Sequence, residues 1–427
     1  MAKYAYINGI ILDGTEDMEP QTGKMILTDG QLIESVTDQK DDLAGYQIVD
    51  LAGKYIMPGL VNLHVHLPAG GKPKKKPSDP VKLVKLVTSN ALFKRIGLSM
   101  CQSYAKMQLM SGVTTIRTVG GVADYDTIIR DKIKSGKILG PRIVASNMAV
   151  SVENGHMAHS LAYVAESADE AADYVRIIAK DKPDVIKLMI TGGVLDAKVK
   201  GEPGELKMPA EYVKAACDEA HNLGFKVAAH VESPEGVKCA LENGVDTIEH
   251  GAKPTPEIID LFKEKDACHV ATLSPALPFA LFDRSISNAS DMEQYNGELV
   301  FEGIIQCAKS CLEEGIPVGL GTDTGCPYVT HYDMWRELNH FHKFCGVSNK
   351  FALHTATMIN AQIAGLGDIT GSIEAGKCAD FVVTQKNPLD DLQALRNISM
   401  VVACGNLIAN PKVKKLPEVE KELDKFL

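Results

Sequence analysis

The chain has 427 residues, 45% of them hydrophobic, and carries 45 basic against 55 acidic side chains, which gives a net charge of −10. This composition provides a large core and argues against nucleic acid as the main partner. No apolar run approaches the ~20 residues that cross a bilayer. The start of the chain lacks a cleavable signal pattern, and the ten cysteines form no CxxC pair. We therefore expect a cytoplasmic protein with reduced cysteines.

Both ends of the chain predict β-structure. Residues 1–58 read as short strands in which Val, Ile and Tyr alternate with polar residues, and Asn-Gly and Asp-Gly mark tight turns. The pattern returns within residues 365–427, in GSIEAGKCADFVVTQ and ISMVVACGNLIAN, before a terminal helix that we expect to be exposed. We expect the two ends to pair into one small β-sandwich domain.

Residues 59–364 alternate short apolar strands with longer helical stretches, which is the pattern of a parallel sheet. One helix is predicted to begin at Pro209 and to end at Gly224. Eight candidate strands predict an α/β fold, a closed (β/α)8 TIM barrel. These strands are LVNLHVHL, VTTIRTVG, RIVASN, VIKLMITGG, KVAAHVE, TIEHG, CHVATL and VGLGTDT.

The first barrel strand carries two imidazoles, His64 and His66, in an otherwise apolar run. Residues i and i+2 of a strand point to the same side, so the two rings project together. Two neutral imidazoles in this arrangement bind a cation or form an ordinary hydrogen-bonded core pair. The pair alone favours the second interpretation.

Other barrel strands also end in polar side chains, which are costly inside apolar strands unless they are paired or bind metal. In such barrels the chemistry lies at the carboxyl ends of the strands. A satisfied core residue or a turn cap explains any one of these side chains, but a metal centre explains all of them together. The six predicted ligands are His64, His66, Lys187, His230, His250 and Asp323.

These residues, in this order, resemble the binuclear pattern of the amidohydrolase superfamily. The phrases MPGLVNLHVH, SGVTTIRTVGG, GVDTIEHG, GTDTG and GSIEAGKCADFVV extend the resemblance over almost the whole chain. The resemblance implies two divalent ions, usually zinc. His64, His66 and Asp323 would hold one ion, and His230 and His250 the other.

The resemblance also implies that Lys187 bridges the two ions as a carbamate formed with CO2. A lysine among cations and apolar walls loses its proton readily, and the neutral amine takes up CO2. A metal-bridging water would become hydroxide near neutral pH. Asp323 would accept its proton and pass it to the leaving amine.

Within the superfamily, PDVIKLMITGG and AHVESPEG are similar to the prolidase-like and imidazolonepropionase-related group of dipeptidases and ochratoxin-hydrolysing amidases. The group places a histidine near the substrate carboxylate, and His156 in VENGHMAHS matches it. His159 is a weaker candidate and His331 a further one, although each could be a loop histidine with ordinary hydrogen bonds. Glu232, which follows the fifth strand, is a candidate for recognising a positive charge on the substrate.

The sequence departs from this group at three places. Thr118 follows Arg117 where the group has an acidic residue, Val231-Glu232 follows His230, and Tyr332 follows His331. These departures leave the predicted metal ligands intact and affect the identity of the substrate.

We expect a metal-dependent hydrolase that cleaves the amide bond of a dipeptide or N-acyl amino acid, with a small-molecule substrate and a homo-oligomeric state. The alternative is an imidazolonepropionase-like cyclic-amide hydrolase or a deaminase, although the resemblance makes Lys187 unusual for a deaminase. A third interpretation is a non-catalytic scaffold, which intact ligands on five strands disfavour.

A run of lysines, Lys72 to Lys76, follows the first barrel strand. Pro73, Pro77 and Pro80 predict an extended loop on the face that carries the predicted site. The loop is either simply solvated or steers anionic substrates toward the ions.

Overall fold

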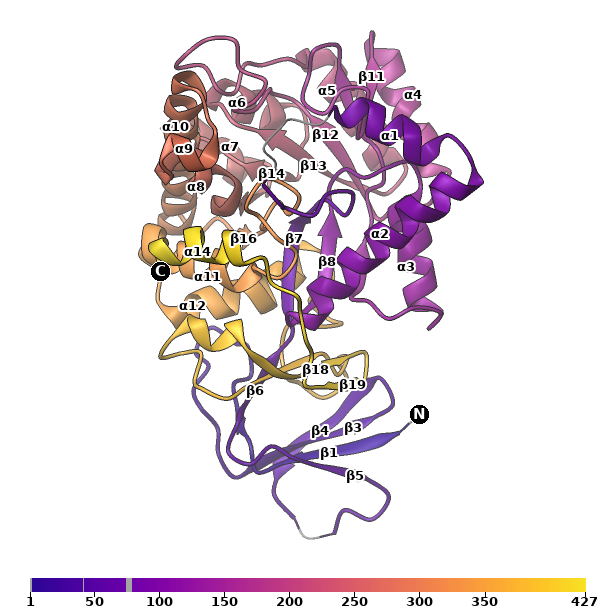
Figure 1. Cartoon of the computed structure of the whole chain (residues 1–427), viewed down its shortest axis with the longest axis vertical. Helices are drawn as coiled ribbons and strands as arrows, with labels where there is room; N and C mark the ends of the chain where they lie inside the picture. Colours follow the sequence, from indigo (N-terminus) through magenta and orange to yellow (C-terminus); the bar gives the residue numbers. More distant parts are fainter. Residues whose placement is uncertain (1, 41, 74–78) are drawn as a thin grey trace.

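The computed structural model describes residues 2–40, 42–73 and 79–427. A barrel with surrounding helices forms the upper part of the molecule in Figure 1, and a β domain lies below it. None of the helices in these ranges is long and apolar enough to cross a membrane.

All eight predicted barrel strands are present. Strands β7, β8 and β9 form a three-stranded sheet. The other five barrel strands belong to a seven-stranded sheet, and the two sheets meet along two seams. At one seam the Asp184 amide donates to Ala145 O at 2.7 Å, and at the other the Asp323 amide donates to His64 O at 2.8 Å. The (β/α)8 barrel is therefore confirmed, and its strands are β7 (Leu60–Val65), β8 (Val113–Thr118), β9 (Arg142–Val144), β12 (Val185–Met189), β13 (Lys226–Val231), β14 (Thr247–His250), β15 (Cys268–Ala271) and β16 (Val318–Leu320).

Two further strands that the sequence did not predict, β10 (Ala149–Val152) and β11 (Ala162–Ala165), extend the larger sheet at β12. They pair in parallel, with Ala149 opposite Ala162. The connection between them contains VENGHMAHS, so this pair fixes the position of the His156 loop.

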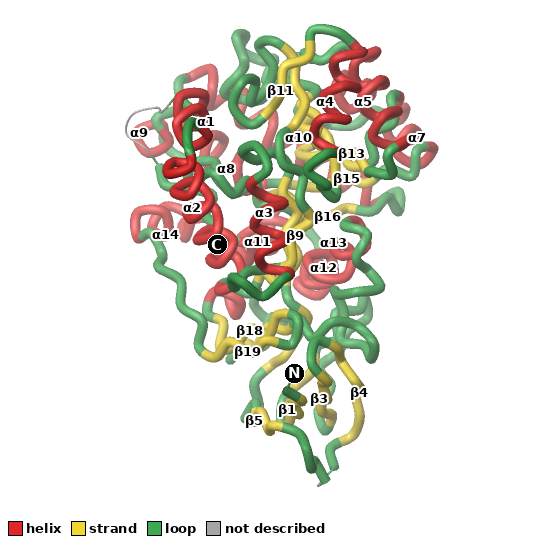
Figure 2. Tube along the Cα trace, turned by 90° about the vertical axis from the view of Figure 1, so that its right-hand side faces the viewer, coloured by secondary structure: helices red, strands yellow, loops and turns green. Residues whose placement is uncertain are grey.

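Helices surround the strands (Figure 2), and the main core lies between the two layers. The predicted helix from Pro209 begins at Ala210, and Gly224, with φ of 85°, follows its end. The longer helices are α1 (Pro80–Thr88), α2 (Ala91–Met110), α3 (Tyr125–Lys134), α4 (Ala168–Ala179), α5 (Ala210–Asn222), α6 (Pro234–Glu242), α7 (Pro256–Glu264), α8 (Leu273–Leu281), α10 (Asp291–Glu313) and α11 (Met334–Cys345). Shorter ones are α9 (Arg284–Ser287), α12 (Asn349–His354), a π-helical turn (Thr355–Ile359), α13 (Asn360–Ile363) and a 3-10 turn (Leu392–Arg396).

The loop predicted after the first barrel strand holds at Lys72 and Pro73 but ends before Pro80. Lys74–Lys76 and Pro77 lie outside the described residues, but Pro80 opens helix α1 instead of extending a loop. The Asp79 side chain accepts a hydrogen bond from the Lys82 amide and caps this helix. Proline suits the first turn of a helix because its missing N–H would have no partner there.

The β domain joins both ends of the chain, as predicted. Phe381 of β17 lies opposite Pro58 of β6 in an antiparallel pair. The two sheets have the orders β4-β3-β1-β5 and β19-β18-β17-β6-β2. Their strands are β1 (Lys3–Ile7), β2 (Ile10–Ile11), β3 (Lys24–Asp29), β4 (Leu32–Asp38), β5 (Gln47–Asp50), β6 (Tyr55–Pro58), β17 (Phe381–Thr384), β18 (Ile398–Ala403) and β19 (Asn406–Ala409). The domain limits 1–58, 59–364 and 365–427 stay predictions.

The terminal helix α14 (Pro417–Leu423), followed by a 3-10 turn (Asp424–Phe426), packs on the barrel, and its predicted exposure is wrong in part. Val419 and Leu423 are buried. The buried guanidinium of Arg336 on α11 donates to Asp424 Oδ1 at 2.7 Å. Apolar and ionic contacts therefore hold this end of the chain against α11.

Candidate metal centre

The two histidines of β7 project together, as the strand periodicity predicts. The ring centroids of His64 and His66 lie 5.2 Å apart. His64 Nδ1 donates to Glu249 Oε2 and His66 Nδ1 donates to Gly120 O, each at 2.8 Å. Each ring therefore presents the lone pair of Nε2 to the barrel mouth.

The histidines of β13 and β14 lie beside this pair. The His250 ring is 4.8 Å from the His64 ring and 4.6 Å from the His230 ring. His250 Nδ1 is hydrogen-bonded to Thr272 Oγ1 at 2.7 Å, and His230 Nε2 donates to Gly192 O at 3.3 Å. Burial lowers the pKa of His250 to about 3 and also lowers that of His230, so both rings are neutral, the form that binds metal.

Asp323 follows β16 and completes the cluster. Its Oδ1 lies 3.2 Å from His66 Nε2 and 3.6 Å from His64 Nε2. Burial alone would raise its pKa, but His64 and His66 hold the pKa well below the usual range, so the group is a carboxylate. Ligand atoms of His64, His250 and Asp323 lie within 4.8 Å of one another, as do those of His230, Glu232 and His250.

Two of these residues have strained backbones. His250 has φ of 68° and Asp323 has φ of 56°, in the left-handed region that side chains other than glycine rarely adopt. Such a conformation costs ~1–3 kcal/mol and persists where the surrounding structure enforces it, typically at functional sites. Here His269 Nε2 donates to His250 O at 2.7 Å and holds that backbone in place.

Lys187 of β12 has an unusual environment. Its side chain is 1% exposed, and its Nζ has no hydrogen-bond partner among the residues that the structure describes. Burial lowers the pKa of this ammonium to about 8, although Glu249 and Asp323 oppose the shift. A buried amine without a partner is costly, and this one is poised to lose its proton.

A buried ion-pair network that the sequence did not predict orients His64. Glu249 accepts from His64 through Oε2 and from Arg117 Nη2 through Oε1, the latter at 2.6 Å. Arg117 also donates to Leu63 O at 2.8 Å and to Thr247 Oγ1 at 3.1 Å. The sequence did contain one indication of this network: Glu249 is an acidic residue within the predicted strand TIEHG, and it is fully buried in the structure.

The predicted substrate residue His156 lies against the cluster. Its ring stacks on His230 with centroids 4.1 Å apart, and its Nδ1 is bonded to Asp196 Oδ2 at 2.5 Å. Asp196 therefore orients the ring and leaves Nε2 free. His159, in contrast, is exposed and pairs with Glu153 at 2.9 Å.

His331 has protein partners at both ring nitrogens. Nε2 donates to Ala69 O at 2.7 Å, and Nδ1 lies 3.3 Å from Gln108 Nε2. The ring also stacks on Tyr104. The role of His331 in substrate binding stays a prediction, and substrate binding would require the ring to give up one of these partners.

Glu232 lies between the metal cluster and a cavity of about 870 Å³. Its Oε2 atom is buried without a partner, and burial raises the pKa of its carboxyl to about 8. The lining is acidic, because it includes five glutamates and one lysine: Glu202, Glu205, Glu232, Glu235, Glu302 and Lys253.

The donor set of the cluster fits divalent cations. Burial lowers the pKa of His64, His230 and His250, and His64 and His66 donate an N–H to a carboxylate or a carbonyl, as metal-binding histidines do. An unpaired lysine and a carboxylate complete the set. A TIM barrel with such a cluster at the carboxyl ends of its strands defines the class of metal-binding hydrolase barrels.

Comparison with known proteins gives the family. Residues 55–408 match the sequence model of the amidohydrolase family. A protein from Bifidobacterium longum, provisionally assigned as a prolidase, is 35% identical, and its crystal structure superposes with a TM-score of 0.88 over 99% of this chain and 98% of that one. A Xaa-Pro dipeptidase solved with methionine in its active site is 27% identical, with a TM-score of 0.82 over 96% of this chain and 100% of that one. Ochratoxinase of Aspergillus niger is 25% identical over an alignment of 337 positions, which covers 71% of this chain and 67% of that protein.

The chain therefore belongs to the amidohydrolase family. It is a hydrolase of carbon–nitrogen bonds, as the sequence predicted.

Proposed function

We propose that this amidohydrolase uses two divalent ions, with zinc as the expected metal, to cleave the amide bond of a dipeptide or N-acyl amino acid. The observation that carries the proposal is the buried amine of Lys187, which has no partner among the described residues and lies beside four histidines. His64, His66 and Asp323 would hold one ion, and His230 and His250 the other. Lys187, as a carbamate, would bind both. The similarity of the whole chain to a Xaa-Pro dipeptidase supports an amide substrate with a free carboxylate.

The bound ions would supply a water of lowered pKa and polarise the amide carbonyl. The side chains of the protein would transfer the proton and keep the metal-binding rings in position. Asp323, ionised in the structure, takes the proton of the attacking water and gives it to the leaving nitrogen. Glu249 and Arg117 keep the His64 ring in one orientation throughout.

His156 is the proposed partner of the substrate carboxylate. Its ring lies on His230, its Nε2 is free, and Asp196 holds the other nitrogen. Because Asp196 holds Nδ1, Nε2 on the other side of the ring would donate to a substrate carboxylate.

Replacement of His156 by alanine is expected to lower kcat/KM for free-acid substrates by roughly 10- to 200-fold, the equivalent of ~1.5–3 kcal/mol for a hydrogen bond to a charged group. Metal content should not change, because the ring is not a proposed ligand. His159→Ala is the matched control, since His159 lies in the same loop but is exposed and paired with Glu153. Equal activity of the wild type on free-acid and amidated substrates would contradict the role of His156.

The acidic cavity beside Glu232 favours a substrate with a positive charge. A cationic group there would lower the pKa that burial raises, restore the Glu232 carboxylate and pair with Oε2, which has no partner within the described protein. Glu232→Gln is expected to lower kcat/KM for substrates with Lys or Arg by about 10-fold or more relative to neutral substrates. Glu235→Gln, at an exposed position of the same cavity, should leave this ratio unchanged. An equal loss on basic and neutral substrates would mean that Glu232 orients the site instead.

The test of the proposed function is a screen of zinc-loaded protein against dipeptides and N-acyl amino acids with proline, basic and aromatic C-terminal residues. Hydrolysis of free-acid amides would support the proposal. Turnover of cyclic amides or amino-substituted rings alone would favour the cyclic-amide hydrolase or deaminase alternative. Binding of two ions without hydrolysis of any amide would favour a scaffold.

A further inference from the structure

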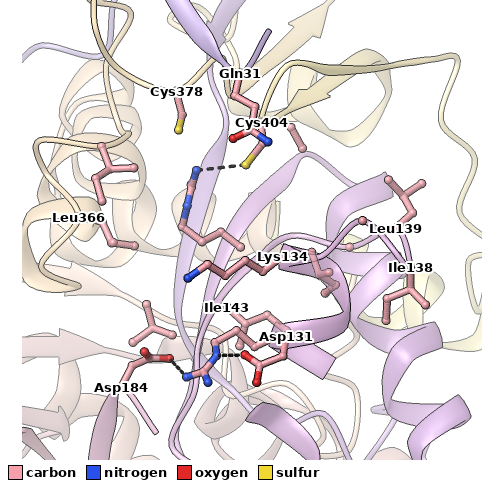
Figure 3. Close-up of a pocket in the computed structure, with 18 of the residues that line it drawn as sticks. Gln31, Asp131, Lys134, Ile138, Leu139, Ile143, Asp184, Leu366, Cys378 and Cys404 are labelled. Carbon is pink, nitrogen blue, oxygen red and sulfur yellow. Dashed lines mark hydrogen bonds and ion pairs between the residues drawn. The ribbon is translucent and has the colours of Figure 1, made fainter. Parts of the chain in front are cut away.

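A second cavity, of about 1000 Å³, lies at the opposite end of the barrel from the metal centre. Figure 3 shows that Cys378 and Cys404 of the β domain face it together. Cys378 precedes β17, and Cys404 lies in the turn between β18 and β19. Arg142, the first residue of barrel strand β9, also lines the cavity. The site is thus built where the base of the barrel meets the β domain.

The two cysteines form a close group with one cation. Their sulfur atoms and a carboxylate oxygen of Asp380 lie within 4.8 Å of one another. Arg142 Nη2 donates to Cys404 Sγ at 3.2 Å, the contact that is dashed in Figure 3, and Nη1 donates to Asp380 Oδ2 at 2.8 Å. Both cysteines are partly exposed and unbridged.

This group does not suit a metal ion. Asp380 Oδ1 already accepts from the Cys404 amide at 2.7 Å, and Oδ2 accepts from Thr370 Oγ1 at 2.9 Å as well as from Arg142. The guanidinium would repel a cation at the sulfurs, whereas it stabilises a thiolate. The charges therefore favour thiol chemistry over metal binding.

The turn that holds Cys404 departs from the usual sequence preference. Cys404 and Gly405 form a two-residue hairpin loop with φ of 45° and 76°, and Ala403 pairs with Asn406 across it. Positive φ at both positions is the type I′ pattern, which favours Asn-Gly, Asp-Gly or Gly-Gly. A cysteine at the first position breaks this local rule, and such departures concentrate at functional sites.

We propose that Cys378 and Cys404 are a peroxide-reactive dithiol that closes to an intramolecular disulfide. The Cys378 thiolate attacks a peroxide oxygen, the O–O bond breaks, and the departing hydroxide takes a proton and leaves as water. The resulting sulfenic acid is then attacked by the Cys404 sulfur. The S–S bond forms, the S–O bond breaks, and the hydroxide leaves as water with the Cys404 proton. Two thiols are oxidised and one peroxide is reduced to two waters.

The electrostatics of the pair agree with this chemistry. The hydrogen bond from Cys404 lowers the pKa of the Cys378 thiol to about 7, against burial and with the help of the Arg142 charge. A thiol with a pKa near neutrality is the more reactive attacking group. Arg142 also donates to Cys404 Sγ, but the hydrogen bond to Cys378, burial and Asp380 raise the pKa of the Cys404 thiol, so the thiolate forms at Cys378.

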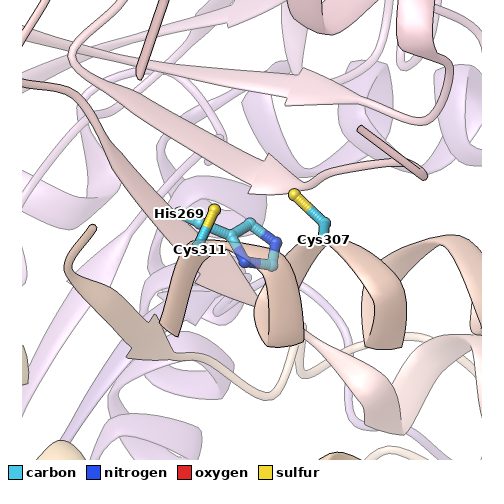
Figure 4. Close-up of side chains that lie close together, drawn as sticks. All are labelled: His269, Cys307 and Cys311. Atoms are coloured by element: carbon cyan, nitrogen blue, oxygen red, sulfur yellow. The ribbon is translucent and has the colours of Figure 1, made fainter. Parts of the chain in front are cut away.

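The chain provides its own matched control, the pair Cys307 and Cys311 on α10 (Figure 4). These thiols are also close together, with His269 in the same group, but both are fully buried. The pKa of the Cys311 thiol is raised by the hydrogen bond between Cys311 and Cys307 and by burial. We therefore expect this pair to resist the oxidant that closes Cys378 and Cys404.

The experiment treats the folded, full-length protein with hydrogen peroxide, blocks free thiols with an alkylating agent and maps the tryptic peptides by mass spectrometry. We expect CADFVVTQK joined to NISMVVACGNLIANPK through a disulfide, reversed by a reductant, while Cys307 and Cys311 stay reduced. Alkylation of Cys378 in the untreated protein should be at least about tenfold faster than that of Cys307.

Two variants separate the steps. In Cys404→Ser, a dimedone-type reagent should trap the sulfenic acid on Cys378, with no crosslink. Arg142→Lys should keep the ion pair with Asp380 yet slow the oxidation, because lysine lacks the second donor that reaches the sulfur. A disulfide between two chains, oxidation of Cys307 and Cys311 at the same rate, or equal alkylation rates for Cys378 and Cys307 would each overturn the proposal.

Discussion

Replacement of Lys187 by alanine is expected to remove one of two bound ions and to lower kcat/KM by about 10³-fold or more, which corresponds to ~4 kcal/mol. The amine is buried without a partner beside the histidine cluster, and the ammonium form would repel two dications. A carbamate on this side chain would instead bind both ions. Metal analysis of the wild type should find close to two ions per chain and that of the variant close to one.

The chemistry of the carbamate offers a sharper test than the loss alone. Short carboxylic acids added to Lys187→Ala should restore part of the metal content and part of the activity, because they fill the position of the missing carboxylate. Lys187→Arg is the control, since the guanidinium stays charged and does not take up CO2. A free lysine in native mass spectra of the active, two-metal enzyme would refute the bridging role.

Replacement of Asp323 by asparagine is expected to lower kcat by about 10²- to 10⁴-fold, the range for loss of a positioned proton-transfer group. The substitution should preserve the fold, because asparagine tolerates the positive φ of 56° at this position better than other side chains do. The loss of charge removes the base that His64 and His66 keep ionised.

Two measurements separate this role from a general defect. Circular dichroism should match the wild type, and raising the pH should not restore activity, because an amide does not gain a base in the accessible range. Metal content should be determined in the same preparation, since Asp323 is also a proposed ligand. Retention of more than about a tenth of the wild-type kcat with both ions bound would exclude Asp323 as the essential base.

The sequence alone determined the barrel and the composition of its site. Each of the eight strands is a short apolar run between helices, and this pattern depends on local periodicity. His64, His230 and Lys187 could be selected because a polar side chain within an apolar strand needs a partner or a metal. Their convergence then followed from barrel geometry, which brings the carboxyl ends of the strands to one mouth.

Only the tertiary structure decided what surrounds that site. Glu249 of β14 reaches His64 of β7 and Arg117 of β8 across the interior of the closed barrel, and no sequence spacing encodes that contact. The sequence predicts His331 as a substrate residue but does not show that Ala69 and Gln108 lie at its ring nitrogens. Such partners come from segments far apart in the chain, so a single sequence names the polar residues but does not show which of them are already satisfied.

The same limit applies at the base of the barrel and at the end of the chain. Cys378 and Cys404 looked like unrelated cysteines until the antiparallel pairing of β17 and β18 brought them beside Arg142. The charged terminal segment looked exposed until Arg336 and the surface of α11 gave it a packing partner. Local pattern fixes the type of each element, whereas long-range packing decides which side chains meet, because that depends on the whole arrangement of strands and helices.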